Sequence, residues 1–381
     1  MERRSTRYLI GFLLVCLTLS SFVAIGQSRP AAQTFQGLKG KPMFVVIPGG
    51  NADDAMSQAF AAVNVPLWSS TFKVGTTTFK FTMVGTNPAA GSATTSIPVV
   101  IVPIRLKFAN GTVLSPVANA CGDTQTPVAR TMNSPIFKNM TFKPGGTNVG
   151  TTQYIDAFQR ANFWHTVSVS APNYHVLLGP VTVKAVQTIT VPAASGQTAA
   201  GPCAKIGEVN INFFDSKAQG LITSLAIPAT SLPLFVDYNS FLFSGTPSNC
   251  CILGYHSANN ANHTYAFAAY SDPGIFGVPI QDIHALSHEI GEWLDDPFGN
   301  NLTPPWGHVG QVSGCQNNLE VGDPVTGKAF TAILNGFTYH PEDLVFLSWF
   351  ALQKPSTAVN GQYTFLKTFT VVAAKCPPGG P

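Results

Sequence analysis

Apolar residues recur with helical spacing between residues 281 and 297, and a set of polar residues follows the same period. The apolar positions are Ile283, Leu286, Ile290 and Leu294. The polar positions, four residues apart, are His284, His288 and Glu292. Because residues three and four apart lie on one side of a helix, the pattern predicts an amphipathic helix. One face packs against the core, and the other presents side chains to a ligand.

The sequence also marks both ends of this helix. Asp282 precedes the first apolar position and is expected to be the N-cap. Pro297 ends the helix because a proline disfavours the helical conformation of the residue before it, here Asp296.

The first half of the chain contains stretches rich in Val, Ile, Thr and Phe, bounded by Gly, Pro and Asn. They predict strands at residues 74–84, 96–108, 166–178 and 182–191. Residues 153–164 have helical spacing instead. Asp156, Arg160 and Trp164 of this segment resemble a binding constellation, but we interpret it as an amphipathic helix packed against the sheet.

Small and polar residues at 192–203 predict a linker or a long hairpin loop, and thus a domain boundary. Beyond it, strands are predicted at residues 208–214, 234–243, 264–270 and 367–374, and a long loop at residues 298–318. We therefore predict an α+β protein. It has a β-rich N-terminal region at residues 27–200, followed by a second domain at residues 201–381.

The polar face of the predicted helix contains His288-Glu289-x-x-Glu292, the zinc-helix pattern H-E-x-x-H with glutamate for the second histidine. Residues i and i+4 project from one side of a helix, so His288 and Glu292 can bind one cation. Glu289, about 100° around the axis, can reach a metal-bound water. A metal lowers the pKa of that water, and a carboxylate can take its proton. This is the chemistry of metal-assisted peptide hydrolysis.

Two segments, SHEIGEWLDDP at residues 287–297 and EVGD at residues 320–323, resemble the motifs of a bacterial branch of zincin-like secreted metallopeptidases. Those motifs are S-H-E-x-x-E-x-x-x-D-P and E-[IV]-G-D. The resemblance covers about residues 264–324. It implies a zincin-like domain in which the strand at 264–270 is the sheet edge above the metal, where a peptide substrate pairs.

The resemblance also implies roles for individual residues. His288 and Glu292 bind a metal, Glu289 is the general base, and the third ligand is Glu320 or Asp323. Of these two we predict Glu320, because its longer side chain can reach in from a loop. Zinc is the favoured metal, and another divalent cation such as manganese or calcium also suits a carboxylate-rich site.

The alternative to a metal site is a solvated helix face that carries His and Glu by chance. Three of the six glutamates in the chain, Glu289, Glu292 and Glu320, fall within 32 residues, which favours a metal site. His284, one turn before His288, is a fourth ligand, a partner of a ligand or a surface histidine. We favour the last two readings over the first.

Residues 1–26 predict a signal peptide, with three arginines, an apolar run and a small-x-small cleavage site before Gln27. An uncleaved membrane anchor is the alternative, because the run is nearly long enough to span a bilayer. Without these residues the chain has 18 basic and 17 acidic residues, a net charge of +1. Near-neutrality argues against nucleic-acid and membrane partners, and we expect a peptide or protein substrate.

Six cysteines follow the predicted signal peptide: Cys121, Cys203, Cys250, Cys251, Cys315 and Cys376. An even number of cysteines in an exported chain predicts disulfides, and the sequence does not choose among the fifteen pairings. The adjacent Cys250 and Cys251 are expected to bond to two different partners, because a vicinal bridge is strained.

Together these features predict a secreted or periplasmic zinc peptidase with Glu289 as general base. One alternative is a non-catalytic secreted binding or surface protein with a structural metal. A closed shell of four ligands would favour it, because catalytic sites keep one position open for water. Another alternative is a β-sandwich adhesin in which the motif is incidental.

Overall fold

The computed structural model describes residues 41–49, 64–374 and 376. The predicted signal peptide at residues 1–26 lies outside the described residues. The described residues form one compact unit. No helix among the described residues is long and apolar enough to cross a membrane.

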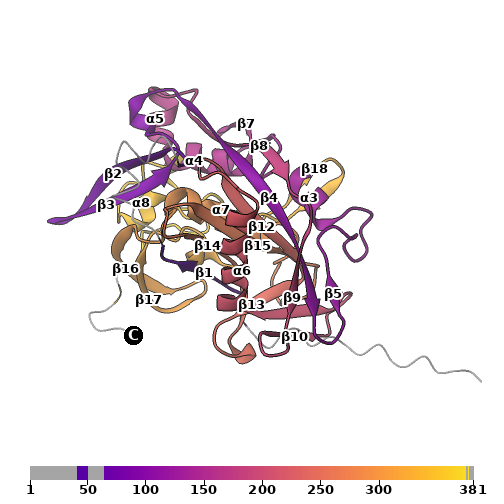
Figure 1. Cartoon of the computed structure of the whole chain (residues 1–381). Coiled ribbons are helices and arrows are strands. Elements are labelled where there is room, and N and C mark those ends of the chain that lie inside the picture. The colour runs from indigo at the N-terminus through magenta and orange to yellow at the C-terminus, as the bar shows by residue number, and fades with distance from the viewer. Residues whose placement is uncertain (1–40, 50–63, 375, 377–381) are drawn as a thin grey trace, which may run out of the picture. The chain divides into compact units, whose positions relative to one another are not determined.

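The unit has an α+β fold built on a large mixed sheet (Figure 1). Its strands, among the described residues, are β1 (Met43–Ile47), β4 (Thr94–Phe108), β5 (Val113–Leu114), β8 (His175–Val183), β9 (Gln187–Val191), β10 (Gly196–Ala199), β11 (Ile206–Asn210), β12 (Leu232–Tyr238), β13 (Ser240–Phe243), β14 (Cys250–Ala258) and β15 (Thr264–Tyr270). They pair in the order β10-β11-β13-β14-β15-β12-β4-β5, with β1 also pairing with β14, and β8 and β9 with β4.

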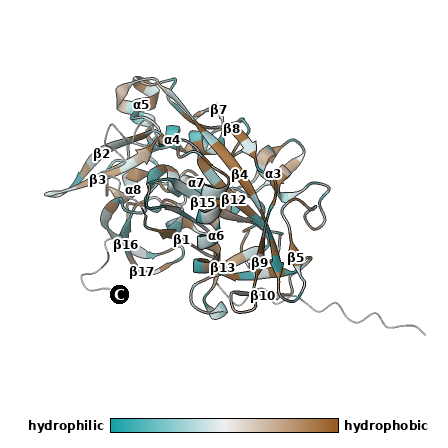
Figure 2. Ribbon diagram, viewed as in Figure 1, coloured by the Kyte–Doolittle hydropathy of each residue, from teal (hydrophilic) through white to brown (hydrophobic). Residues whose placement is uncertain are grey.

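The central strands are apolar because both faces of the sheet are covered. β4 contains the run Ile-Pro-Val-Val-Ile-Val-Pro-Ile, which is apolar along most of its length in Figure 2. It pairs in parallel with β12, and every residue of β12 is buried. Strands covered on both sides lose the alternation of polar and apolar residues that a half-exposed strand shows.

Two helices cover opposite faces of the sheet. On α6 (Ile211–Ser224), Asp215 accepts a hydrogen bond from the hydroxyl of Tyr255 on β14, at 3.0 Å. On α7 (His284–Asp295), Glu289 lies 3.2 Å from the ring of His256, the next residue of β14. Successive side chains of a strand point to opposite faces, so α6 and α7 lie on either side of β14.

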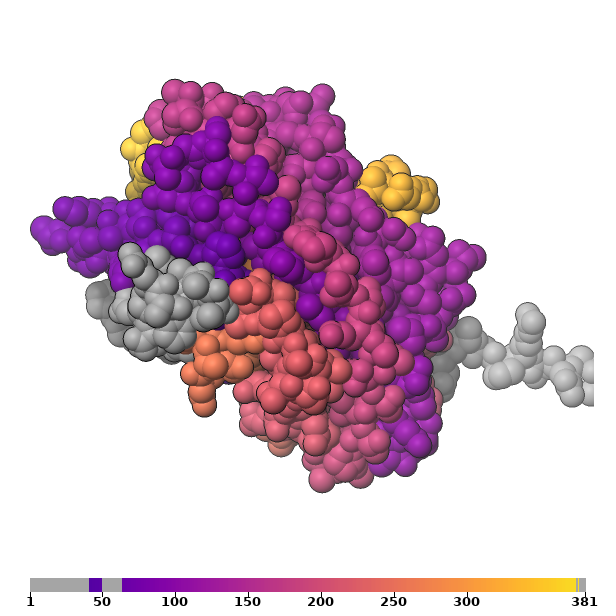
Figure 3. Space-filling model, turned by 45° about the horizontal axis from the view of Figure 1, so that its top comes forward, coloured from indigo at the N-terminus to yellow at the C-terminus, as the bar shows by residue number. Residues whose placement is uncertain are grey.

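The remaining elements surround this core. The helices are α3 (Pro127–Asn133), α4 (Tyr154–Asn162), α5 (Trp164–Val169) and α8 (Leu347–Phe350). Four hairpins pair β2 (Leu67–Val74) with β3 (Thr77–Val84), β6 (Met140–Phe142) with β7 (Gly150–Thr152), β16 (Leu302–Val309) with β17 (Val312–Asn318), and β18 (Ala332–Leu334) with β19 (Phe337–Tyr339). The β2–β3 hairpin projects from the surface in Figure 3.

Several predicted elements are wrong. Residues 166–178 are not one strand, since α5 continues the chain directly after α4 and β8 starts only at His175. The predicted strand at 208–214 ends at Asn210, whose side chain caps α6 by accepting from the Phe213 N–H. The predicted loop at 298–318 is the β16–β17 hairpin, and residues 367–374 form no strand.

The strand at residues 264–270 exists as β15, but it is not a sheet edge. It pairs with β12 on one side and with β14 on the other. Both sets of its backbone groups are therefore used within the sheet, and a substrate cannot pair with this strand. The expectation that β15 would be the edge above the metal is thus wrong.

The six cysteines form three disulfides: Cys121–Cys203, Cys250–Cys251 and Cys315–Cys376. The prediction that Cys250 and Cys251 have different partners is wrong. The fold brings the other four cysteines together in pairs, which leaves the two adjacent residues of β14 to bond to each other.

Strands from both sides of residue 200 pair in the same sheet, as β4 does with β12. The segment at 192–203 contains β10, which forms an antiparallel pair with β11. The β-rich region 27–200 and the zincin-like domain 201–381 remain predictions.

Candidate metal centre

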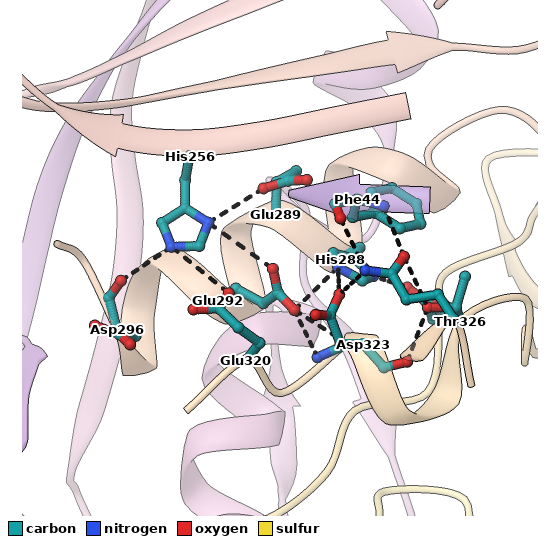
Figure 4. A network of polar contacts seen from close by, with 12 residues as sticks. Phe44, His256, His288, Glu289, Glu292, Asp296, Glu320, Asp323 and Thr326 are labelled. Atoms are coloured by element: carbon teal, nitrogen blue, oxygen red, sulfur yellow. Dashed lines mark hydrogen bonds and ion pairs between the residues drawn. The ribbon is translucent and has the colours of Figure 1, made fainter. Parts of the chain in front are cut away.

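Helix α7 places its polar residues in the protein interior (Figure 4). His288, Glu289 and Glu292 are each at most 1% exposed. Gly254 of β14 leaves room for Glu289, since a Cβ there would lie 2.5 Å from Cγ of that residue. Its partner across the ladder is Ala268 of β15, which is also small. The sheet therefore admits a helix whose inner face carries ionisable side chains.

The start of this helix differs from the prediction. Ile283 is the N-cap, and Asp282 has a positive φ of 46°. The Asp282 carboxylate accepts hydrogen bonds from the backbone N–H of Ile283 and of His340, and it lies 2.7 Å from the His340 ring. Asp282 thus fixes the approach of a distant loop and does not cap the helix.

One cluster of potential metal ligands surrounds the Nε2 atom of His288. The Nε2 atom lies 3.0 Å from Glu292 Oε1 and 3.5 Å from Asp323 Oδ1. The other ring nitrogen, Nδ1, lies 2.5 Å from Glu342 Oε2. A carboxylate accepts the Nδ1 proton, which leaves the Nε2 lone pair directed at Glu292 and Asp323. His288, Glu292 and Asp323 form a group that could hold a metal ion.

Glu342 holds the histidines of the helix in place. Its Oε1 accepts a hydrogen bond from the Gly327 N–H at 2.8 Å and lies 3.2 Å from His284 Nε2. Its own backbone N–H donates to the Ser287 hydroxyl at 2.8 Å. His284 is fully buried and is therefore not a surface histidine. A carboxylate behind a ligating histidine is the usual second partner in metal sites.

The turn at residues 320–323 carries Asp323 to the helix. The backbone N–H groups of Gly322 and Asp323 donate to Glu292 Oε1 at 3.1 and 3.2 Å. Gly322 lies against His288, since a Cβ there would be 2.4 Å from Nδ1. Only glycine permits this approach, and the turn is thereby fixed on the face of the helix that carries His288 and Glu292.

A second cluster forms around His256 of β14. Its Nδ1 lies 3.2 Å from Glu289 Oε2 and 3.8 Å from Glu292 Oε2. Its Nε2 lies 3.0 Å from the Asp296 carbonyl oxygen and 3.9 Å from Glu320 Oε2. His256, Glu289 and Glu292 also form a group that could hold a metal ion. Glu292 belongs to both groups.

The first described strand, β1, covers the centre. The Phe44 ring of β1 stacks on the His288 ring, with centroids 3.6 Å apart. The Gln311 amide accepts from the Phe44 N–H and donates to the Phe44 carbonyl, and it also donates to Asp323 at 2.5 Å. The described part of β1 is thereby attached to His288 and, through Gln311, to Asp323.

Burial shifts the proton affinities of these groups. It raises the pKa of Glu289 and of Glu320 well above the usual range, and it raises the pKa of Asp323 to about 7. Burial alone would lower the pKa of His288, but the Glu292 and Glu342 carboxylates outweigh it and raise that pKa. The centre thus contains more buried carboxyl groups than histidines to neutralise them. It requires protons or a cation.

Two carboxylate oxygens of the centre have no hydrogen-bond partner among the described residues: Glu289 Oε1 and Glu320 Oε2. Such buried orphans are uncommon in folded proteins and call for an unseen partner. The donor set of imidazole nitrogen and carboxylate oxygen suits zinc and other divalent cations. The residues therefore fit a metal. A third grouping, His308 with Cys315 and Cys376, does not, because its two cysteines form a disulfide.

The structure thus gathers every residue proposed from the sequence: His288, Glu289, Glu292, Glu320 and Asp323. Asp323 lies beside His288 and Glu320 beside His256. Which of the two coordinates a cation stays a prediction.

Sequence analysis missed His256 and Glu342. The one signal for His256 is a lone histidine in an apolar strand, and the signal for Glu342 is the scarcity of glutamate in the chain.

A comparison with solved structures finds metalloproteinase-II from Bacteroides fragilis. It is 8% identical, with 68% of this chain and 93% of that chain covered, at a TM-score of 0.19. A likeness at this TM-score carries no information on fold or activity. No protein-family model matches the chain. No curated protein matches it.

Proposed function

We propose that the protein is an exported, metal-dependent peptidase with a zincin-like active-site helix. The observation that carries the proposal is the orientation of His288. Glu342 accepts its Nδ1 proton, so the Nε2 lone pair faces two carboxylates with nothing but a proton or a cation able to join them. The predicted signal peptide and the three disulfides support export.

His288 and Glu292, with Asp323 or Glu320, would hold the cation. A bound zinc or other divalent ion supplies Lewis acidity, which lowers the pKa of water and polarises a carbonyl group. Glu289 is suited to accept the proton of water. Its burial raises its pKa well above the usual range, which makes the carboxylate a stronger base, and its Oε1 has no partner among the described residues. We propose a peptide or protein as the substrate.

The test compares Glu289→Gln with wild type. Wild-type protein is first screened against a broad peptide library with and without a chelator. The variant should keep its fold and its metal at His288 and lose hydrolysis, because an amide keeps the shape of the side chain but cannot accept the proton. Glu208→Gln is a matched control, since Glu208 is buried on β11 beside Gln197 and outside the centre.

A non-catalytic protein with a structural metal is the second candidate, and the burial of the centre favours it. His256, His288, Glu289 and Glu292 are at most 1% exposed, and Phe44 covers His288. Catalytic sites keep a position open for water. If wild type binds metal tightly, cleaves no peptide and behaves as Glu289→Gln in every assay, the structural role replaces the peptidase.

A further inference from the structure

In the second cluster, around His256, the lone pair of a ring nitrogen again faces carboxylate oxygens. Here the position of the ring proton follows from a single contact. His256 Nε2 lies 3.0 Å from the Asp296 carbonyl oxygen, which can only accept a hydrogen bond. The proton of the neutral ring is therefore on Nε2, and Nδ1 carries a lone pair. This lone pair faces carboxylate oxygens of Glu289 and Glu292.

The three ligand atoms converge, and only a proton or a cation could join them. Glu289 Oε2 and Glu292 Oε2 lie 3.2 and 3.8 Å from His256 Nδ1, and all three residues are at most 1% exposed. Two ligands bound to one cation at about 2.0–2.2 Å stand roughly 3–4 Å apart. The separations in this cluster therefore match a coordination shell.

A further sign of an unseen ligand lies in this cluster. The Glu289 Oε1 atom is buried without a hydrogen-bond partner in the described part of the chain. Glu320 Oε2 also lacks one, but it lies 3.9 Å from His256 Nε2, the nitrogen on the other side of the ring from the Nδ1 lone pair. Unpaired buried carboxylate oxygens are costly, and a cation within reach would remove the cost.

Glu292 connects the two clusters. Its Oε1 faces His288, and its Oε2 faces His256 (Figure 4). A carboxylate that gives one oxygen to each of two cations holds them roughly 3.5–4 Å apart, as in two-metal sites. The side chain is thus placed as a bridge.

We infer that His256, Glu289 and Glu292 form a second divalent-cation site, bridged by Glu292 to the site at His288. The inference rests on the proposed function in that both sites use Glu292. It adds a form of regulation. With the second cation bound, Glu289 is a ligand and cannot accept a proton, so the second equivalent of metal should inhibit hydrolysis.

The test is the metal stoichiometry of the full chain, which needs no substrate. Protein stripped with a chelator is titrated with Zn²⁺ by calorimetry, and the bound metal is measured by elemental mass spectrometry after gel filtration. We expect two Zn²⁺ per chain in wild type and one in His256→Gln. In this variant the glutamine amide can still donate to the Asp296 carbonyl but offers no Nδ1 lone pair. The second equivalent should bind roughly 100-fold more weakly.

His308→Asn is the matched control, because His308 is an exposed histidine outside the centre, and asparagine tolerates its φ of 53°. It should keep two Zn²⁺. One Zn²⁺ in both wild type and His256→Gln overturns the second site and leaves the proposed peptidase standing. No Zn²⁺ in wild type overturns both.

A second measurement on wild type keeps the inference testable if His256→Gln does not fold. Two Mn²⁺ ions bridged by Glu292 should give the electron paramagnetic resonance spectrum of a coupled pair. A spectrum of isolated Mn²⁺ alone, at saturating metal, contradicts the bridged site.

Discussion

Two neighbouring helices, α4 and α7, each carry a buried polar cluster, and only the cluster on α4 satisfies itself. Asp156 of α4 accepts hydrogen bonds from the Thr152 hydroxyl and the Val176 N–H, each at 2.7 Å, and lies 2.7 Å from the His175 ring. Arg160 donates to the carbonyls of Val149, Pro172 and Tyr174. In this cluster every contact joins a donor to an acceptor.

Without added protons or a cation, the cluster on α7 joins acceptors to acceptors. The lone pairs of His256 and His288 face the carboxylates of Glu289, Glu292 and Asp323. Both clusters are buried and both stand on helices in a chain with 10% charged residues. The difference shows that burial and charge alone do not distinguish a ligand site from a structural network. The balance of donors and acceptors does.

The prediction with the largest expected effect tests the difference between the two clusters directly. Glu292→Ala removes the carboxylate common to both groups of donors, so zinc binding should be lost and the thermal stabilisation by zinc should disappear. Asp156→Asn should leave the zinc stoichiometry unchanged, while lowering the free energy of unfolding by about 1–3 kcal/mol through lost hydrogen bonds. Elemental analysis and thermal melts with and without zinc measure both. Full zinc binding by Glu292→Ala would contradict the assignment of the centre.

The second prediction concerns the metal-free protein. Burial raises the pKa of Asp295 and of Asp323 to about 7, whereas an unfolded aspartate has a pKa near 3.9. Between about pH 4 and pH 7 the folded chain therefore binds more protons than the unfolded chain, and its stability falls as the pH rises. We expect the metal-free protein to melt at a higher temperature at pH 5 than at pH 7.5.

Adding zinc gives a second test of the same pH dependence of stability. A cation that holds Asp323 as a carboxylate removes the contribution of that residue, so saturating zinc should weaken the loss of stability toward pH 7.5. Asp323→Asn without metal should show a weaker pH dependence than wild type, because it lacks one of the carboxyl groups whose pKa burial raises. If the melting temperature of metal-free wild type rose with pH, protonation of the buried carboxyl groups would not be what stabilises the metal-free centre.

The sequence predicts what local patterns determine. Helix α7 follows from its apolar period, and the gathering of scarce glutamates marks it as a candidate metal-binding helix. Strand β4 follows from its run of β-branched residues. By contrast, α6 is not predicted, although its buried Ile211, Phe214, Ala218 and Ile222 have the same spacing as the apolar residues of α7. Its first apolar residues follow directly on β11, so the predicted strand runs past the capping Asn210.

The rest of the centre depends on contacts between distant parts of the chain. His256 approaches Glu289 from a strand 33 residues earlier, and Glu342 approaches His288 from 54 residues later. Phe44 comes from the first described strand. No spacing rule connects such positions, because sheet pairing and loop packing set them. For the same reason the pairing of Cys250 with Cys251 required the fold.

The third prediction tests the support behind the first cluster. Glu342→Gln keeps the shape of the side chain but removes the negative charge that accepts the His288 Nδ1 proton. Zinc affinity should fall about 10- to 100-fold, the usual effect of changing the partner of a ligating histidine. Calorimetric titration measures it, with Glu208→Gln as the control glutamate. An unchanged affinity would mean that His288 needs no partner.

The smallest expected effect concerns the cover over the centre. Phe44 is 2% exposed and stacks on His288, so its ring shields the imidazole face. Phe44→Leu keeps an apolar side chain in β1 but removes the stack, which is worth about 0.5–1.5 kcal/mol in aromatic pairs. Zinc should then leave roughly 2- to 10-fold faster when a chelator is added. A stopped-flow assay with a coloured chelator measures the rate. Phe72→Leu is the control, because Phe72 stacks on Phe79 in the β2–β3 hairpin, away from the centre. Equal release rates from wild type and both variants would show that the ring does not control access to His288.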